Sequence, residues 1–599
     1  MPSDLSRTSA RVWLLLILVA GAALRFSALS YGLPFVYNPD EVAIMNRALA
    51  LPTNGFNPKN FLYPSLYFYV LLAWEAAGFV LGRVAGAFDS FAAFERSYFT
   101  DPTWIFLTGR ALTALCGVVT IWLTYLLGRR LAGRTAGVVA AAVLAVSPIA
   151  VRDAHYVKHD VPVTLLVVLA LLALVHAEAQ RHRAELKRWV IAGAVAGLAM
   201  STHYYAIFVA LPIAVAALWP DRVTDHEVTR TRGDEESFAV RLRWLVAAGV
   251  GATIAFIAGS PFLITDPARV LTDVVGNRQI VMDRTTEAAG LFGSLGFYLR
   301  MLGWNAVGPI AAVLAIVGLI IALRRGRTHI IVLLIFPVAF LLFIGNTFPA
   351  TRYLNPILPF VAVLAGLTFS LLPLTRNVPT TLAPGGLPDI SPYVLVPGVT
   401  LVLLVSGGVP SAHDVGFFGQ TDTRTQAYDW IAKNLPAESS VLIQPYSVPL
   451  RQSRAGLVEA LRATQGDEAR ASTRFRKQLD LSPYPSPSYR TIYLGDGGLD
   501  QDKIYVSPSA FADGTLAPLR TLVVTHVILK RYNQPDVALA SLDRALAKDA
   551  QLIVTFSPYR AAATPTTRAA VSPFLHNTDA IIDPALERPG PIIEIWRLR

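Results

Sequence analysis

Long apolar stretches, separated by short segments rich in charged residues, dominate roughly the first two thirds of the chain. A helix needs roughly 20 apolar residues to cross a bilayer core of about 30 Å. Eleven stretches reach or approach that length, so they predict transmembrane helices. They cover residues 12–29, 104–127, 135–150, 161–178, 189–202, 204–219, 244–262, 304–323, 329–346, 355–373 and 391–409.

One further apolar stretch, residues 61–88, is assigned by charge rather than by length. Loops rich in Lys and Arg stay in the cytoplasm. Arg7 and Arg11 precede the first predicted helix, and three arginines occupy 129–134. A crossing by 61–88 would put this second cluster outside, so we predict an interfacial or re-entrant helix there.

This topology predicts a cytoplasmic N-terminus and an extracytoplasmic C-terminus. The predicted cytoplasmic loops then hold 18 Lys and Arg residues, and the longer outer loops hold 11. That bias agrees with the positive-inside rule. A cleaved signal peptide is the alternative for 12–29, but no small-residue cleavage site follows it and Arg25 interrupts the apolar run.

The pattern changes at residue 410, where shorter periodic segments and Pro-rich turns begin. Helical periodicity appears at 426–435 and near 536–548, and buried strands are predicted at 440–443, 521–529, 552–556 and 592–596. We therefore predict two domains, a transmembrane domain at 1–409 and a small extracytoplasmic α/β domain at 410–599.

Composition supports a multi-pass protein of the plasma membrane. The chain is 53% hydrophobic and 16% charged, with a mean hydropathy of +0.47, whereas soluble domains are nearer 25% charged. The net charge of +11 would also fit a protein that binds nucleic acid. However, residues 410–599 hold 21 Lys and Arg against 19 Asp and Glu, so the excess lies among the apolar segments and nucleic acid is not predicted. Cys116, the single cysteine, excludes an intrachain disulfide and a cysteine-based metal site.

Two segments that face outward in this topology carry unusual charges. The first contains Asp40 and Glu41, which either catalyse or form the acidic first turn of a solvated helix. The second is 152–160, where six of nine residues are ionisable and Asp160 stands at the membrane edge. A carboxylate there is costly unless it is paired or used.

The alternative for 152–160 is a purely structural cluster of ion pairs. His155 and His159 are four residues apart, so on a helix they share a face, which suits either a metal ion or a polar rim. The metal ligands therefore stay unknown. No cofactor is certain, and a divalent cation is possible.

The topology gathers Asp40, Glu41 and Asp160 on one side with Arg352 and Tyr353. Carboxylates and cations at one membrane face suit group transfer from an anionic lipid. A carboxylate can take the proton of an acceptor hydroxyl.

The cations have a complementary role. Arg352, Lys158 or Lys59 can bind the phosphate that leaves. We also count His155, Tyr63 and Tyr353 as candidate substrate-binding residues.

Four motifs, in this order after the acidic pair, resemble one known family. They are Tyr-Pro-Ser-Leu-Tyr-Phe-Tyr at 63–69, Leu-Gly-Arg-Arg-Leu-Ala-Gly-Arg at 127–134, Asp-Val-Pro at 160–162 and Arg-Tyr-Leu-Asn-Pro-Ile-Leu-Pro at 352–359. Their order resembles the polyprenyl-phosphate-sugar-dependent glycosyltransferases of the GT-C fold, relatives of protein O-mannosyltransferases and lipid A aminoarabinose transferases. The resemblance covers roughly 10–375.

The resemblance implies a polytopic α-helical membrane protein with about eleven transmembrane helices and GT-C-like architecture. It also implies an inverting transferase that takes its sugar from a polyprenyl-phosphate donor and gives it to a protein, glycan or lipid. The family's catalytic base falls on Asp40 or Glu41, and its second-loop acid falls on Asp160. Relatives often have His-Pro-Pro where this chain has Tyr63-Pro64-Ser65, which leaves the role of that segment open.

Two other functions fit the same apolar pattern. A transporter or flippase usually carries polar residues near the bilayer midplane or two similar halves. Here Arg25 and Arg110 are the only Lys or Arg residues within the predicted helices, and no half-to-half similarity is evident. A non-catalytic partner of a glycosylation complex would keep the fold and lack the base.

Overall fold

The computed structural model describes residues 4–179, 185–219, 237–283, 290–324, 326, 328–371, 392–497, 500–576 and 581–599. The chain forms two compact units. The first contains Met1–Leu29, Asp40–Ala77 and Leu107–Val415, and the second contains Ser30–Pro39, Gly78–Phe106 and Gly416–Arg599. The sequence-based division at 409/410 did not assign the two early segments to the C-terminal unit.

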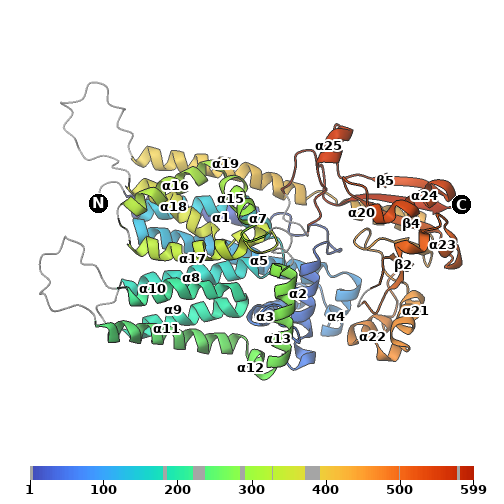
Figure 1. Cartoon of the computed structure of the whole chain (residues 1–599), viewed down its shortest axis with the longest axis horizontal. Coiled ribbons are helices and arrows are strands. Elements are labelled where there is room, and N and C mark those ends of the chain that lie inside the picture. Colours follow the sequence, from blue (N-terminus) through green and yellow to red (C-terminus); the bar gives the residue numbers. More distant parts are fainter. Residues whose placement is uncertain are drawn as a thin grey trace, which may run out of the picture. The chain divides into compact units, whose positions relative to one another are not determined.

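Every apolar stretch predicted as a transmembrane helix coincides with a helix. In chain order these are α1 (Arg7–Phe26), α5 (Thr103–Ala132), α6 (Arg134–Ala145), α8 (Asp160–Glu178), α9 (Leu186–Thr202), η3 (Tyr204–Val209) with α10 (Ala210–Leu218), α11 (Phe238–Gly259), α16 (Pro309–Arg324), α17 (Thr328–Ile344), α18 (Leu358–Leu371) and α19 (Pro392–Phe418). The prediction of a polytopic helical membrane protein is confirmed. Figure 1 shows these helices.

Only some of the helices are long enough to cross a membrane by themselves. Among the described residues, six helices are long and apolar enough to cross a membrane, or seven if the bent pair Leu295–Ala306 and Pro309–Arg324 is one span. One of the six is α3 (Leu66–Val84), which lies within the 61–88 segment that the charge pattern made interfacial. The interfacial position of α3 therefore stays a prediction.

Local sequence explains where helices end. His203 has an extended backbone (φ −154°, ψ 131°) between α9 and η3, so the predicted division between the stretches 189–202 and 204–219 is confirmed. α5 ends before Gly133, whose φ of +97° suits glycine. The Asp4 carboxylate accepts hydrogen bonds from the backbone amides of Arg134 and Thr135, which caps α6.

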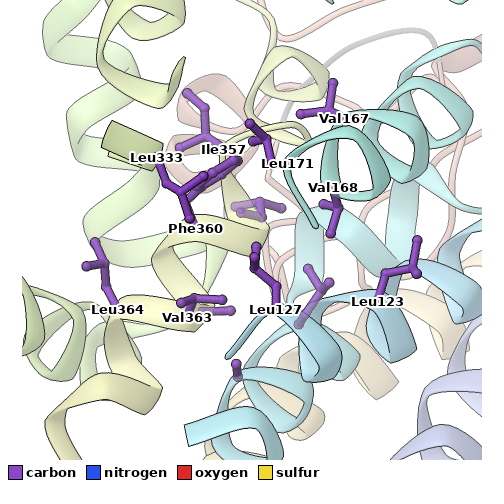
Figure 2. Close-up of a cluster of buried hydrophobic side chains, with 14 of the residues drawn as sticks. Leu123, Leu127, Val167, Val168, Leu171, Leu333, Ile357, Phe360, Val363 and Leu364 are labelled. Atoms are coloured by element: carbon purple, nitrogen blue, oxygen red, sulfur yellow. The ribbon is translucent and has the colours of Figure 1, made fainter. Parts of the chain in front are cut away.

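The apolar core of the first unit joins helices that are distant in sequence. Leu123 and Leu127 of α5, Val167, Val168 and Leu171 of α8, and Phe360, Val363 and Leu364 of α18 meet in one cluster (Figure 2). Elsewhere α9 and α11 lie side by side (Figure 1), and Trp189 stacks on Trp244 with ring centroids 5.5 Å apart. Their close approach depends on small residues.

Gly193 of α9 tests this close approach. A Cβ atom there would lie 1.9 Å from the Ala248 carbonyl oxygen, a backbone atom that cannot rotate away. We expect Gly193→Ala to lower the free energy of unfolding by about 1–3 kcal/mol through overpacking, measured as a lower thermal unfolding midpoint in detergent. Gly249→Ala in α11 is the matched control because nothing lies within 4 Å of its Cβ position, and it should be neutral or slightly stabilising. Equal effects of the two substitutions would show that this helix contact is not tight.

The second unit contains a six-stranded sheet in the order β3-β2-β1-β4-β6-β5. Its strands are β1 (Ser440–Ile443), β2 (Arg490–Leu494), β3 (Ile504–Val506), β4 (His526–Arg531), β5 (Ala550–Phe556) and β6 (Ile592–Leu598). The first four in that order run parallel, and β6 is antiparallel to both of its neighbours. The predicted C-terminal α/β fold is confirmed, although β2 and β3 were not predicted.

Helices and two early segments complete the second unit. The helices include α20 (Thr423–Asn434), α21 (Arg454–Gln465), α22 (Thr473–Leu479) and α24 (Ala540–Asp549). Tyr37 Oη lies 2.6 Å from Thr425 Oγ1, and Asn38 Nδ2 donates to the His576 carbonyl oxygen at 2.7 Å. These bonds hold segment 30–39 within this unit.

Candidate active site

A charged cluster lies where three segments of the first unit meet: the start of α2 (Pro39–Ala50), the segment before α8, and η6 (Thr351–Leu354). Lys158 Nζ lies 3.0 Å from Asp40 Oδ2. The Asp40 side chain is 48% exposed and that of Lys158 only 10%. Asp40 therefore presents an accessible carboxylate, held by a lysine whose own charge is largely shielded from solvent.

The charges around Asp40 keep it ionised. Burial raises the pKa of the Asp40 carboxyl, but Lys158, Arg352 and Arg47 together outweigh burial and hold that pKa below its ordinary value. Asp40 is thus a carboxylate throughout the neutral range.

Asp160 is the second carboxylate of the cluster. It is the first residue of α8 and only 6% exposed. Arg352 and Lys158 are its strongest favourable electrostatic partners, and Asp40 also acts on it. The structure therefore brings together Asp40, Asp160, Lys158 and Arg352, although they come from distant parts of the chain.

Glu41 has surroundings that differ from those of Asp40 and Asp160. Its carboxylate is fully buried and accepts hydrogen bonds from Arg110 Nε at 2.9 Å and Nη2 at 3.0 Å. The backbone amide of Val157 also donates to it at 3.0 Å. Because Arg110 Nη1 donates to the Leu29 carbonyl oxygen as well, this pair joins α2 and α5 to two loops.

His155 and Lys59, two of the predicted substrate-binding residues, have other surroundings than the cluster. His155 is buried, and its two ring nitrogens lie 2.8 Å from the carbonyl oxygens of Val151 and Ser27. Lys59 is exposed on a turn with φ +57°, and in the described part of the chain no ion pair joins it to Asp40 or Asp160.

A buried polar network fixes η6, which carries Arg352 and Tyr353. Arg152 Nη2 donates to Thr351 Oγ1, and Arg152 Nε lies 3.5 Å from Asp153 Oδ1. Asn355 Nδ2 donates to Asp153 Oδ2 at 2.6 Å. Arg152 and Asp153 therefore neutralise each other, as the structural alternative expected, whereas Lys158 contacts Asp40.

A cavity of about 210 Å³ opens beside the cluster. Its polar and aromatic lining includes Tyr63, His203, Tyr204, Tyr205, Asn277, Arg278 and Tyr353, and its apolar lining includes Val274, Phe343 and Ile344. Tyr63 stacks on His159 with ring centroids 4.3 Å apart and meets His203 edge-on at 5.1 Å. The Arg352 guanidinium lies 5.2 Å from the Tyr353 ring centroid, so η6 contributes to both the charged cluster and the cavity.

The rings that line this cavity are neutral. Burial raises the pKa of Tyr63 well above its ordinary value. Burial and then the Arg352 charge lower the pKa of His203 to about 3, and burial lowers that of His159 well below its ordinary value. Arginine therefore supplies the positive charge beside the cavity at neutral pH.

Several residues of this region were not predicted from the sequence. Arg47 acts on Asp40 and Tyr63 electrostatically. It follows Asp40 by seven residues, which is two helical turns, and this spacing could have indicated that the two side chains share a helix face. His203 was recognised only as a helix break. Asn277 and Arg278 come from α13 (Pro267–Arg278), which the apolar pattern did not reveal.

Metal ligation by the histidine pair finds no support in the geometry. Among the residues that the structure describes, no three His, Cys, Asp or Glu side chains gather closely enough to hold an ion. His155 contacts backbone carbonyls, and His159 packs among Tyr63, Tyr67 and Phe68. The two rings thus have separate environments.

One family model matches part of the chain. The family model described as dolichyl-phosphate-mannose-protein mannosyltransferase matches residues 106–230, about a fifth of the chain, including Arg110, Lys158, Asp160 and His203. This match confirms the resemblance that the sequence motifs predicted. Over that segment the chain is similar to this mannosyltransferase family.

Solved structures with a similar chain course have low sequence identity to this protein. The archaeal oligosaccharyltransferase AglB from Archaeoglobus fulgidus, in complex with an inhibitory peptide and a dolichol-phosphate, is 12% identical over 98% of this chain and 88% of its own, with a TM-score of 0.49. ArnT from Cupriavidus metallidurans, bound to undecaprenyl phosphate, is 13% identical over 99% of this chain and 98% of its own, with a TM-score of 0.46. The arabinofuranosyltransferase AftD from Mycobacteria is 15% identical over 99% of this chain and 42% of its own, with a TM-score of 0.37. No curated protein matches this chain.

Proposed function

We propose that this protein is an inverting glycosyltransferase that moves a sugar from a polyprenyl-phosphate donor to an acceptor hydroxyl. The observation that carries the proposal is the half-exposed Asp40 carboxylate, held by Lys158 beside Arg352 and an aromatic cavity. A base next to cations is what transfer from a phosphate leaving group requires. The matched family's description, which names dolichyl-phosphate-mannose as donor, agrees with this chemistry.

The proposed reaction is a direct displacement at the anomeric carbon. The acceptor oxygen forms a bond to that carbon while its proton passes to Asp40. The bond from the carbon to the phosphate oxygen breaks, and its electron pair leaves with the lipid phosphate. A single displacement inverts the anomeric configuration.

Asp40 and the cations have separate tasks in this reaction. An acceptor hydroxyl is a poor nucleophile at neutral pH, and a positioned base typically contributes 10²–10⁴-fold. Because the pKa of Asp40 is low, it takes the proton only once the new bond is well formed. Arg352 and Lys158 stabilise the growing charge on the phosphate.

The cavity suits the apolar and ring-shaped parts of such a donor. Tyr63 and Tyr353 offer aromatic faces, and Phe343, Ile344 and Val274 offer apolar contacts. Asp160, buried near Arg352 and Lys158, has a positioning role on these two cations. Tyr63 stands where relatives often have histidine, and its stacking on His159 makes it part of the cavity wall.

We propose that this site faces the extracytoplasmic side. Helix α1 has 20 residues and begins at Arg7, so it is about 30 Å long. The Ser27 carbonyl at its far end contacts His155, just before Lys158. The arginine-rich start of α1 and the charged cluster thus lie about a bilayer apart, which supports a cytoplasmic N-terminus and an extracytoplasmic C-terminal unit.

Direct turnover tests the proposed function. The purified full chain, in detergent with added phospholipid, is incubated with a panel of polyprenyl-phosphate sugars and mixed peptide, glycan and lipid acceptors. Mass spectrometry follows the free polyprenyl phosphate, which we expect with at least one donor, and glycosylated acceptor in equal amount. Folded protein that releases no lipid phosphate from any donor would refute the proposal. Movement of an intact donor across proteoliposomes without cleavage would favour the transporter.

The pH profile tests the role of Lys158. Lys158 is the strongest of the charges that lower the pKa of Asp40, so Lys158→Met should raise that pKa. The active carboxylate is present above its pKa and lost as pH falls, so the acid limb of kcat should move to higher pH by about one unit. The readout is the midpoint of that limb rather than the rate itself.

Lys59→Met is the matched control for this experiment. Lys59 is exposed and outside the cluster, so its removal should leave the midpoint where the wild type has it. An unchanged acid limb in Lys158→Met would mean that Asp40 does not set the pH dependence.

Arg352 should act mainly on the donor. A charge-assisted hydrogen bond to phosphate contributes roughly 1.5–3 kcal/mol, so Arg352→Gln should raise the donor KM about 10- to 100-fold. Initial rates at varied donor concentration measure this, with Arg300→Gln, an exposed arginine of α15 (Leu295–Met301), as control. A normal donor KM in Arg352→Gln would remove Arg352 from the phosphate site.

A further inference from the structure

A second and larger cavity, of about 750 Å³, lies between the start of α1 and the end of α5. Four arginines are among its lining residues: Arg7, Arg11, Arg129 and Arg134. It lies at the opposite end of these helices from the charged cluster, because Arg129 follows Arg110 by 19 residues, about 28 Å of helix. The proposed catalytic reaction does not use it.

The lining changes from charged to apolar along both helices. On α1 the cavity residues are Arg7, Arg11 and Leu14, which follow helical spacing on one face. On α5 the spacing runs from Trp122 through Leu126 to Arg129. On both helices the arginines lie at the end that the topology places in the cytoplasm, and the apolar side chains lie one to two turns farther into the helix. The cavity is therefore amphipathic along the membrane normal.

The charges of this cavity are poorly balanced. Asp4 is the only acidic side chain in its described lining, and it pairs with Arg134 at 3.2 Å. Four arginines against one aspartate leave a net charge of +3. Arg7 and Arg11 are exposed, and Arg129 lies 5.5 Å from the Tyr125 ring centroid. Guanidinium groups arranged in this way bind phosphate well.

We infer that this cavity is a binding site for an anionic phospholipid. A phosphate headgroup pairs with the arginines while an acyl chain lies along Leu14, Trp122 and Leu126. Free phosphate would leave the apolar part unused, and a zwitterionic lipid would compensate the +3 charge poorly. A lipid bound there bridges α1 to α5, and Trp122, which is 44% exposed, is accessible to its acyl chain.

Quenching of Trp122 fluorescence by brominated lipid tests this inference on the detergent-solubilised full chain. The difference in quenching between wild type and Trp122→Phe isolates the Trp122 signal from the other tryptophans. We expect saturable quenching by brominated phosphatidylglycerol, and much weaker quenching by brominated phosphatidylcholine. Because a basic residue near the surface contributes about 1 kcal/mol, Arg7→Gln/Arg11→Gln should weaken phosphatidylglycerol binding roughly 30-fold.

Two further variants keep the test decisive. Arg243→Gln removes an exposed arginine of α11 outside the cavity and should bind as the wild type does. Arg129→Gln leaves the N-terminal arginines in place and should weaken binding roughly fivefold. It therefore tests the lipid site independently if the double variant does not insert into the membrane. Equal quenching by both lipids, or wild-type binding in the cavity variants, would overturn the inference. Displacement of phosphatidylglycerol by inorganic phosphate, or by equimolar polyprenyl phosphate, would overturn it too, because the site would then belong to those ligands.

Discussion

Asp40→Asn is expected to lower the turnover number at least about a hundredfold while the dissociation constant of the donor changes little. Asparagine keeps the size of the side chain and loses its basicity, and a positioned base contributes 10²–10⁴-fold, or about 3–5 kcal/mol of barrier. The carboxylate is half-exposed beside Lys158, so an acceptor can reach it. Single-turnover release of lipid phosphate measures the rate, and equilibrium binding of labelled donor measures the affinity.

Asp89→Asn is the control for this substitution, because Asp89 is an exposed aspartate outside the cluster. It should retain full turnover. If Asp40→Asn also retains full turnover in normally folded protein, Asp40 is not the base, and the non-catalytic alternative gains support. If its loss of rate is explained entirely by weaker donor binding, Asp40 acts on the donor instead.

Arg110→Gln is expected to lower the free energy of unfolding by about 3–5 kcal/mol, because it leaves the Glu41 charge buried without its partner. Both side chains of the pair are fully buried. The thermal unfolding midpoint of the purified protein measures the loss, and Arg269→Gln, an exposed arginine of α13, should have almost none.

A double substitution separates structure from catalysis at this pair. Arg110→Met with Glu41→Met removes both charges, so it should regain part of the lost stability. Glu41→Gln alone should destabilise the protein more than it slows the chemical step in molecules that remain folded. A Glu41→Gln protein with normal stability and no turnover would instead make Glu41 the base.

Much of the fold could be predicted because the bilayer constrains sequence strongly. A span must be apolar along its whole length, so each of the eleven predicted stretches coincides with a helix. The break at His203 was equally visible, since polar residues interrupt a long apolar run there. In the C-terminal unit, β1 and β6 were predicted because apolar residues dominate both segments, whereas β3, three residues long, is too short to show a pattern.

The composition of the candidate site could be predicted only in part. The topology indicated that Asp40, Asp160, Lys158 and Arg352 share one end of the helices. It could not decide between Asp40 and Glu41, because neighbours on a helix point about 100° apart. The different surroundings of the two carboxylates depend on Arg110, 69 residues beyond Glu41, whose side chain lies in the interior where Glu41 points.

Long-range polar contacts explain the remaining differences. Asn38 bonds to the backbone of His576, 538 residues away, so segment 30–39 groups with the C-terminal unit although its own pattern resembles a loop. His155 looked like a site residue because it lies among charges, yet backbone carbonyls occupy its ring nitrogens. A histidine's partners are set by the fold and do not show in local spacing.

The most direct test of the proposed site is a structure of the full chain with a non-cleavable phosphonate analogue of the donor. We predict the phosphonate within hydrogen-bond distance of Arg352 or Lys158, the isoprenoid chain in the cavity between Tyr63 and Phe343, and the Asp40 carboxylate on the face of the anomeric carbon opposite the phosphonate. An analogue bound elsewhere, or bound in this cavity with Asp40 on the same face as the phosphonate, would contradict the proposed site and its mechanism.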